Sequence, residues 1–567
     1  MRTALRAALV VCLGLAAGCA TPPAPPPPRE SPAQAARRLD AALDDVLSFR
    51  DGLLREALDL GRLDRADREA AATREIAALT LVLDGFPDLD VDGAVDRDLA
   101  RMVLDGAILD LALARAKEQD VRRLAGPATA LAFLAEPDPP SPATIGLLAG
   151  GVDGVYPEPH ALGEGTWRPP ELRSAAARNK QCAHLLRVRG AQAQVLDPSR
   201  GKVARGVADE AAKRAEAYAG VLEKRAEEAS KKYDGFGLPC GRDAFVAMLR
   251  TRHGVDASPE DLVAFGEEML AQTSRDLEAL AAADFPGRTW RQALEEVRRD
   301  HAEPAAMPAE AFAAALAARD FTLREGFVTI PEAGRLAHIE MVDEEMAKSY
   351  PFAAYSFRRP TAEGESGRYV VSPGATWMDA AQQEERLRGN CRAWTRVVAA
   401  HETWPGHHLQ FWVADTSVSR IRREVTTPVF VEGWGLYCEG LLARHGFFPG
   451  AAERLALLVM RAWRASRVII DVKVHCEQMT AKEAIDFLVE HAALPRDGAT
   501  AEVRRYMNSP TQPFSYAWGC REIERLHADE QRRLGAAFDE RAFHDKLLRC
   551  GAVPFPFVRR LFGDGAK

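Results

Sequence analysis

Three histidines and a glutamate lie close together in the segment His401-Glu402-Thr403-Trp404-Pro405-Gly406-His407-His408. A His followed directly by Glu, with a further His shortly after, is typical of zinc peptidases. Two neutral imidazoles bind the metal, and the Glu takes a proton from the metal-bound water. This pattern predicts a hydrolytic zinc site with His401 as a ligand and Glu402 as the general base.

The spacing differs from the usual pair of histidines four residues apart. In a regular helix His407 would lie roughly 240° around the axis from His401, and His408 would return to the same face about 10 Å further along. Pro405 cannot donate a helical hydrogen bond, and Gly406 accepts backbone angles closed to other residues. We therefore expect two residues to loop out, so that His407 becomes the second ligand. The alternative is a helix break with surface histidines.

Catalytic zinc needs a third protein ligand and an open position for water. Glu432 and Glu439 are seven residues apart and share a face of a predicted helix. We assign Glu432 as the third ligand and Glu439 as the residue that orients a ligand imidazole. The reverse assignment remains open, and His408 would be the fourth ligand of a closed, structural site.

A further candidate lies in the helical pattern Arg467, Asp471, His475, where each residue is four after the last. Asp471 is expected to orient His475, which would then donate to the tetrahedral intermediate or bind substrate. The alternative is a buried ion pair between helices.

The elements that must position these residues are mainly helical. Amphipathic patterns run from about residue 31 to 135, resume near Pro170 and are strong over 203–232, whereas residues 136–172 are rich in Pro and Gly. Convincing strand candidates in the central region are limited to 327–330 and 368–371. We predict a mainly helical catalytic domain over 36–565, with two lobes and the metal site in 395–440.

Composition supports a globular body. The 567 residues are 47% hydrophobic and 28% charged, which excludes wholesale disorder and collagen-like fibres. The net charge of -8 gives no electrostatic case for nucleic acid as a partner. No Walker phosphate loop, nucleophile elbow or Rossmann glycine signature is found.

The N-terminus predicts export. Residues 1–18 have the basic start, short apolar run and small residues of a signal peptide, and Cys19 follows directly. Small residues before a Cys resemble a bacterial lipoprotein cleavage box, so Cys19 is expected to be lipidated and to anchor the chain to a membrane. The proline tract up to residue 35 would be a semi-rigid tether. For a possible disulfide in this oxidising compartment, the pair to test is Cys182 with Cys240.

The two motifs, His401-Glu402 through Gln410 and Glu432-Gly433-Trp434 through Tyr437, together resemble the bacterial family known as domain of unknown function 885. This family includes many lipoproteins and is grouped with the gluzincin metallopeptidases. The resemblance would cover roughly 40–560. It implies a mainly helical, zincin-like fold with a small β-sheet and a deep substrate groove.

The resemblance also implies roles for two other segments. In related gluzincins a late Tyr or His donates a hydrogen bond to the developing oxyanion, which makes Tyr516 the candidate here. The strand 368–371 resembles the zincin edge strand that pairs with an extended peptide substrate, the alternative being a plain hairpin.

The sequence therefore predicts a zinc metallopeptidase, anchored to the bacterial envelope, that hydrolyses peptides in the periplasm with one Zn²⁺ per chain. Two alternatives are a metal-binding lipoprotein without turnover and a hydrolase of non-peptide amides.

Overall fold

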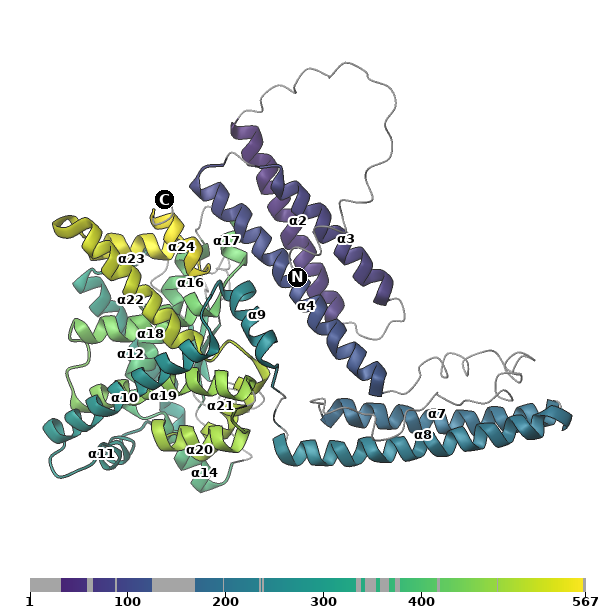
Figure 1. The fold of residues 1–567 in the computed structure, drawn as a ribbon. Helices are drawn as coiled ribbons and strands as arrows, with labels where there is room; N and C mark the ends of the chain where they lie inside the picture. The colour runs from purple at the N-terminus through teal and green to yellow at the C-terminus, as the bar shows by residue number, and fades with distance from the viewer. Residues whose placement is uncertain are drawn as a thin grey trace, which may run out of the picture.

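The computed structural model describes residues 32–58, 65–86, 89–124, 169–196, 198–233, 236, 239–332, 338–341, 353–356, 367–372, 378–415, 419–476 and 478–563. The predicted signal peptide, Cys19 and most of the predicted 136–172 connector lie outside these residues. Figure 1 shows a helical body, a group of three helices beside it and a long helical hairpin. No helix in the described part of the chain is long and apolar enough to cross a membrane.

The first group consists of α2 (Pro32–Leu58), α3 (Arg65–Asp84) and α4 (Val91–Leu124). Their apolar residues, including Leu43, Val46 and Leu99, are buried between the helices. Two ion pairs join α4 to the body, because the Arg422 side chain bonds to both Asp92 and Asp96. The prediction of helices in this region is confirmed up to Leu124, and residues 125–135 lie outside the described part of the chain.

The hairpin consists of α7 (Pro169–Leu196) and α8 (Pro198–Tyr233), which pack along each other. Small residues line the seam: Ala208, Ala212, Ala215 and Ala219 are fully buried. A Cβ at Gly190 would lie 2.8 Å from the Ala208 side chain, so the two helices approach closely there. Ala and other strong helix formers also favour such long helices.

The body contains the remaining elements. Its helices are α9 (Arg242–His253), α10 (Pro259–Asp284), α11 (Trp290–Val297), α12 (Met307–Glu325), α14 (Ala380–Gly389), α15 (Arg392–Glu402), α16 (His407–Asp415), α17 (Arg420–Glu424), α18 (Pro428–Arg444), α19 (Ala451–His475), α20 (Ala481–Ala492), α21 (Arg496–Asn508), α22 (Ser515–Leu534), α23 (Glu540–Arg549) and α24 (Phe555–Phe562), with 3₁₀ turns η2 (Pro304–Ala306) and η4 (Gly535–Ala537). The chain is mainly helical, as predicted.

The central helix of the body is α19, which is buried along most of its length. It packs against α10, α15 and α22. The α10 helix begins with a capping box, in which Ser258 and Asp261 satisfy each other's backbone N–H groups. A buried helix with neighbours on several sides gives the site a rigid support.

A three-stranded sheet lies upstream of the metal motif. Strand β3 (Arg368–Val371) is in the middle, parallel to β1 (His338–Met341) and antiparallel to β2 (Ala353–Ser356). The strand predicted at 368–371 is therefore confirmed, but its assignment as an edge strand is wrong, because both of its sides are paired. Among the described strands, β1 and β2 lie at the edges of this sheet.

The predicted strand at 327–330 is also wrong. Phe327 and Val328 are buried, but the backbone groups of this segment bond to side chains of α23 instead of to another strand. His544 binds the carbonyl of Phe327, and Asp545 accepts the N–H of Thr329. The Cys182–Cys240 disulfide is not formed either, because Cys240 is a free thiol beside His475.

Helices α18 and α22 cross at two glycines, which makes their contact sensitive to added volume. A Cβ at Gly433 would lie 2.5 Å from the carbonyl carbon of Gly519, and a Cβ at Gly519 would meet the Val429 carbonyl oxygen. We expect Gly519→Ala to destabilise the fold by at least about 1–3 kcal/mol through overpacking. Thermal unfolding measures this. The control Gly220→Ala has no atom within 4 Å of its added Cβ and should be neutral or stabilising. Equal melting temperatures for the two variants would contradict the tight crossing.

Candidate metal centre

The helix that carries His401 stops immediately after it and restarts at His407. The N–H of Gly406 bonds to the carbonyl of Ala400 at 3.2 Å, six residues back instead of four. The N–H of Leu409 likewise reaches Thr403 at 3.3 Å. The Trp404–Pro405 bond is cis, and a Cβ at Gly406 would overlap the His401 carbonyl oxygen. Two residues are thus looped out, as the Pro-Gly pair predicts.

The break is held against α18 by Trp434. Its indole N–H donates to the Pro405 carbonyl at 2.9 Å, and its ring is fully buried. A large buried ring with a satisfied N–H fixes the loop relative to the helix that carries the third candidate ligand.

Three candidate ligands converge at this place. His401 Nε2 lies 3.7 Å from Glu432 Oε2, and His407 Nε2 lies 3.4 Å from the same oxygen. The imidazole rings are perpendicular, with centroids 4.6 Å apart. Ligand atoms about 3.4 Å apart are what a tetrahedral zinc ion with bonds near 2.1 Å requires. The donor set therefore fits zinc.

The other nitrogen of each imidazole is occupied. His401 Nδ1 bonds to Glu439 Oε1 at 2.8 Å, and His407 Nδ1 bonds to Gln410 Oε1 at 3.2 Å. These bonds place a proton on each Nδ1 and direct both Nε2 atoms at Glu432, which is the usual support of metal-ligating histidines. The geometry thus favours Glu432 as ligand and Glu439 as orienting residue over the reverse assignment.

Glycine makes room for the first ligand on α18. Gly435 lies between Glu432 and Glu439 on one helix face, and a Cβ there would be 2.5 Å from His401 Cε1. The His401 imidazole therefore packs directly on the α18 backbone at Gly435. Glu432 lies one turn before this glycine and Glu439 one turn after it.

The electrostatics favour a cation. Burial alone would lower the pKa of His401, but the carboxylate of Glu432 and the hydrogen bond to Glu439 raise it to about 9. Burial would raise the pKa of Glu432, yet the two imidazoles hold it well below its usual range. Positive charge is thus stabilised where the three residues meet. Burial raises the pKa of Glu402, the adjoining candidate base, against the opposing effect of the two imidazoles.

Tyr516 lies beside the cluster. Its ring stacks on His401 with centroids 6.2 Å apart. Gln512 Nε2 donates to Glu432 Oε1 at 3.2 Å and to the Tyr516 hydroxyl at 3.4 Å. The structure therefore brings Tyr516 to the same site as the three candidate ligands.

His475 does not join them. Its Nδ1 accepts the N–H of Cys240 at 3.3 Å, and its Nε2 bonds to the carbonyl of Tyr506 at 3.1 Å. The side chain is fully buried, and burial lowers its pKa to about 4. Both ring nitrogens bond to backbone groups, so His475 connects the end of α19 to Cys240 and Tyr506. It is not placed to act on a substrate.

Asp471 has a different role from the predicted one. Its carboxylate accepts the backbone N–H groups of Thr511 and Phe514, at 3.2 and 3.1 Å. It therefore shapes the turn that presents Gln512 to Glu432, and it lies 3.8 Å from His475 Nε2 without a hydrogen bond.

His408 lies outside the cluster. It is fully buried, and its Nδ1 bonds to the hydroxyl of Tyr355 on β2 at 2.9 Å. Among the described residues, the group that converges at this site is His401, His407 and Glu432. The geometry does not support His408 as a fourth ligand.

Sequence reasoning missed the residues that support the ligands. Gln410 is one helical turn after His407, so its contact could have been expected from spacing. Gln512 and Arg464, which donates to Glu439 at 3.3 Å, come from distant parts of the chain and carry no local signal. Arg505 in turn donates to Gln512 Oε1 at 2.6 Å, which fixes the orientation of that amide.

We expect Glu439→Gln to weaken zinc binding by about 10–100-fold, because the amide holds the His401 N–H less strongly. Titration of the metal-free protein with zinc measures the change. The matched control is Glu530→Gln, since Glu530 is also buried and pairs with an arginine, Arg533, on its own helix. Equal zinc affinity of Glu439→Gln and wild type would contradict the orienting role.

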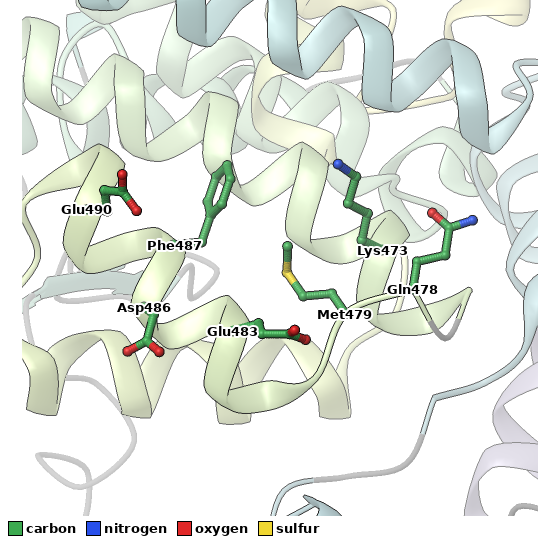
Figure 2. Close-up of a pocket in the computed structure, with 7 residues that line it drawn as sticks. All are labelled: Lys473, Gln478, Met479, Glu483, Asp486, Phe487 and Glu490. Atoms are coloured by element: carbon green, nitrogen blue, oxygen red, sulfur yellow. The ribbon is translucent and has the colours of Figure 1, made fainter.

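A surface pocket in the described part of the chain lies away from the His401, His407 and Glu432 cluster. Figure 2 shows it at the end of α19 and along α20, lined by Lys473, Gln478, Met479, Glu483, Asp486, Phe487 and Glu490. Its volume is about 560 Å³. None of these residues belongs to the His-Glu cluster, so this pocket is not the predicted substrate groove.

The chain belongs to the family described as bacterial protein of unknown function (DUF885), whose sequence profile matches residues 162–561. The predicted resemblance is confirmed, although the match begins well after residue 40. A search of curated proteins finds no match.

Two solved structures share the fold. One, from Shewanella oneidensis, is a candidate lipoprotein of unknown function, with a TM-score of 0.64, 18% identity, and coverage of 93% of this chain and 99% of that one. The other, from Colwellia psychrerythraea, is also a candidate lipoprotein, with a TM-score of 0.61, 18% identity, and coverage of 93% and 98%.

Proposed function

We propose that this protein is a zinc-dependent peptidase of the bacterial cell envelope that hydrolyses peptides in the periplasm. The observation that carries the proposal is the convergence of His401, His407 and Glu432 directly beside a half-buried glutamate, Glu402. A purely structural zinc site has no use for a general base.

Each residue of the site has a role in this reaction. His401, His407 and Glu432 hold zinc, which when bound acts as a Lewis acid and lowers the pKa of water to about 7. Glu402 accepts a proton from the attacking water and returns it to the leaving amine. Tyr516 donates a hydrogen bond to the developing oxyanion.

The zincin-like fold with a deep substrate groove is part of the same proposal. It rests on the two motifs and on the mainly helical body with a small sheet next to the metal helix. Envelope attachment rests on the lipoprotein-like N-terminus with Cys19 and on the two structural relatives, both candidate lipoproteins.

The test is to purify residues 20–567, measure bound metal and incubate the protein with a mixed peptide library. We expect zinc at the His401 site and cleaved peptides, whose termini show whether cuts are internal or at one end. Zinc without cleavage would favour a binding lipoprotein or a hydrolase of other amides. Absence of metal after reconstitution would overturn the proposal.

A further inference from the structure

A second group of metal-ligating side chains lies where α22 meets α23. His527 comes from α22, and Glu540 and His544 come from α23. One ligand atom from each residue lies within 4.8 Å of the other two. In the part of the chain that the structure describes, this spacing is otherwise found in the His401 site alone.

The scaffold of this group is rigid. Glu540 and His544 are four residues apart on α23, so they project from one face about one turn apart. Asp539 caps the same helix by accepting the N–H of Ala542 at 2.8 Å. His527 lies in the interior of the 20-residue α22. Sites built on helices hold ligand geometry better than sites on loops.

His544 is oriented as metal-ligating histidines usually are. Its Nδ1–H donates to the carbonyl of Phe327 at 2.7 Å, which leaves the lone pair on Nε2. In this structure the hydroxyl of Tyr437 donates to His544 Nε2 at 2.9 Å.

His527 and Glu540 are close but not hydrogen-bonded. His527 Nε2 lies 3.7 Å from Glu540 Oε1, and this buried nitrogen has no hydrogen-bond partner. The same 3.7 Å separates His401 from Glu432 in the first site. The other oxygen of Glu540 bonds to Nε2 of His445, the residue directly after α18, at 3.2 Å. An unpartnered buried nitrogen facing a fixed carboxylate needs a partner such as a cation.

We infer that His527, Glu540 and His544 form a second divalent-cation site, with the donor set of zinc. The side chains of His527 and Glu540 are 21% and 31% exposed, so an ion can enter and water can complete its coordination. The ion displaces the Tyr437 hydroxyl from His544, and this hydrogen bond competes with binding. The bound ion links α23 to α22, the helix that carries Tyr516.

The test uses the full mature chain, stripped of metal with a chelator and titrated with Zn²⁺ alone. We expect two equivalents for wild type and one for each of His527→Gln, Glu540→Gln and His407→Ala. The double variant His407→Ala/His527→Gln should bind none. The matched control His301→Gln removes a His-Glu pair of 3.2 Å for which the described residues offer no third ligand, and it should retain two equivalents.

The two sites are separable in this design. Suppose that wild type binds only one equivalent of Zn²⁺, and that this equivalent is lost in His407→Ala but retained in His527→Gln. This result would overturn the second site and leave the proposed peptidase intact. If the single equivalent is instead lost in His527→Gln and retained in His407→Ala, only the first site would be overturned.

Thermal unfolding gives an independent readout, because a ligand that binds only the folded state raises the melting temperature. We expect Zn²⁺ to raise the melting temperature of His407→Ala but not that of the double variant. Tyr437→Phe, which removes the competing hydroxyl, should bind zinc at this site more tightly than wild type. Unchanged or weaker binding by Tyr437→Phe would contradict the assignment of His544 Nε2 as a ligand.

Discussion

Replacement of Glu402 by Gln is expected to abolish peptide hydrolysis while zinc remains bound. Glu402 follows His401 directly, but the ligand atoms that converge belong to His401, His407 and Glu432. The amide has nearly the shape of the carboxyl group but cannot accept the proton. General acid–base groups contribute about 10²–10⁴-fold to rate, so kcat should fall by at least that range.

Two measurements on Glu402→Gln are needed, the steady-state rate and the metal content. The matched control is Glu278→Gln, because Glu278 is an exposed residue of α10. Full activity in Glu402→Gln would contradict the assigned base. Loss of zinc together with activity would show instead that Glu402 helps to hold the metal.

The second large effect is expected from Gly435→Ala. The added Cβ would lie 2.5 Å from Cε1 and 2.6 Å from Nε2 of His401, and the helix backbone beneath it cannot yield. The imidazole must therefore move away from Glu432. We expect zinc affinity to fall by at least about tenfold, since metal sites tolerate little displacement, and stability to fall by about 1–3 kcal/mol from overpacking.

The matched control is Gly440→Ala on the same helix. Its added Cβ would meet only the flexible end of Arg444, at 3.4 Å. Replacing a helical Gly by Ala usually stabilises by about 0.5–1 kcal/mol, so this variant should retain zinc and melt no lower than wild type. Zinc titration and thermal unfolding check both. If the two variants behaved alike, the close packing of His401 on α18 would be wrong.

The part of this site that could be predicted is local in sequence. His401, Glu402 and His407 are placed by a short segment whose Pro and Gly signal the break, and Glu432 and Glu439 by helical spacing. Gln512 and Arg464 could not be predicted, because their contacts depend on how α19 and α22 pack. His475 was misassigned for the same reason: spacing places it on a helix face but does not say what that face meets.

The fold shows the same division. The long helices follow from periodic apolar and alanine-rich patterns, and α8 begins and ends close to the predicted 203–232. All three strands have four residues, but 368–371 is closely bounded by Gly367 and Pro373-Gly374, whereas β1 and β2 lack such turn residues at both ends. The segment at 327–330 has strand-like residues, but its hydrogen-bond partners are side chains of α23.

The looped-out residues between α15 and α16 also constrain how this protein can evolve. The loop sets the angle of His407 through its length, because each residue turns a helix by about 100°. A deletion or insertion of one residue between His401 and His407 would therefore swing the second ligand away from Glu432, even with every ligand retained. Side chains in this loop can be exchanged as far as packing allows, but its number of residues is fixed by the positions of His401 and Glu432.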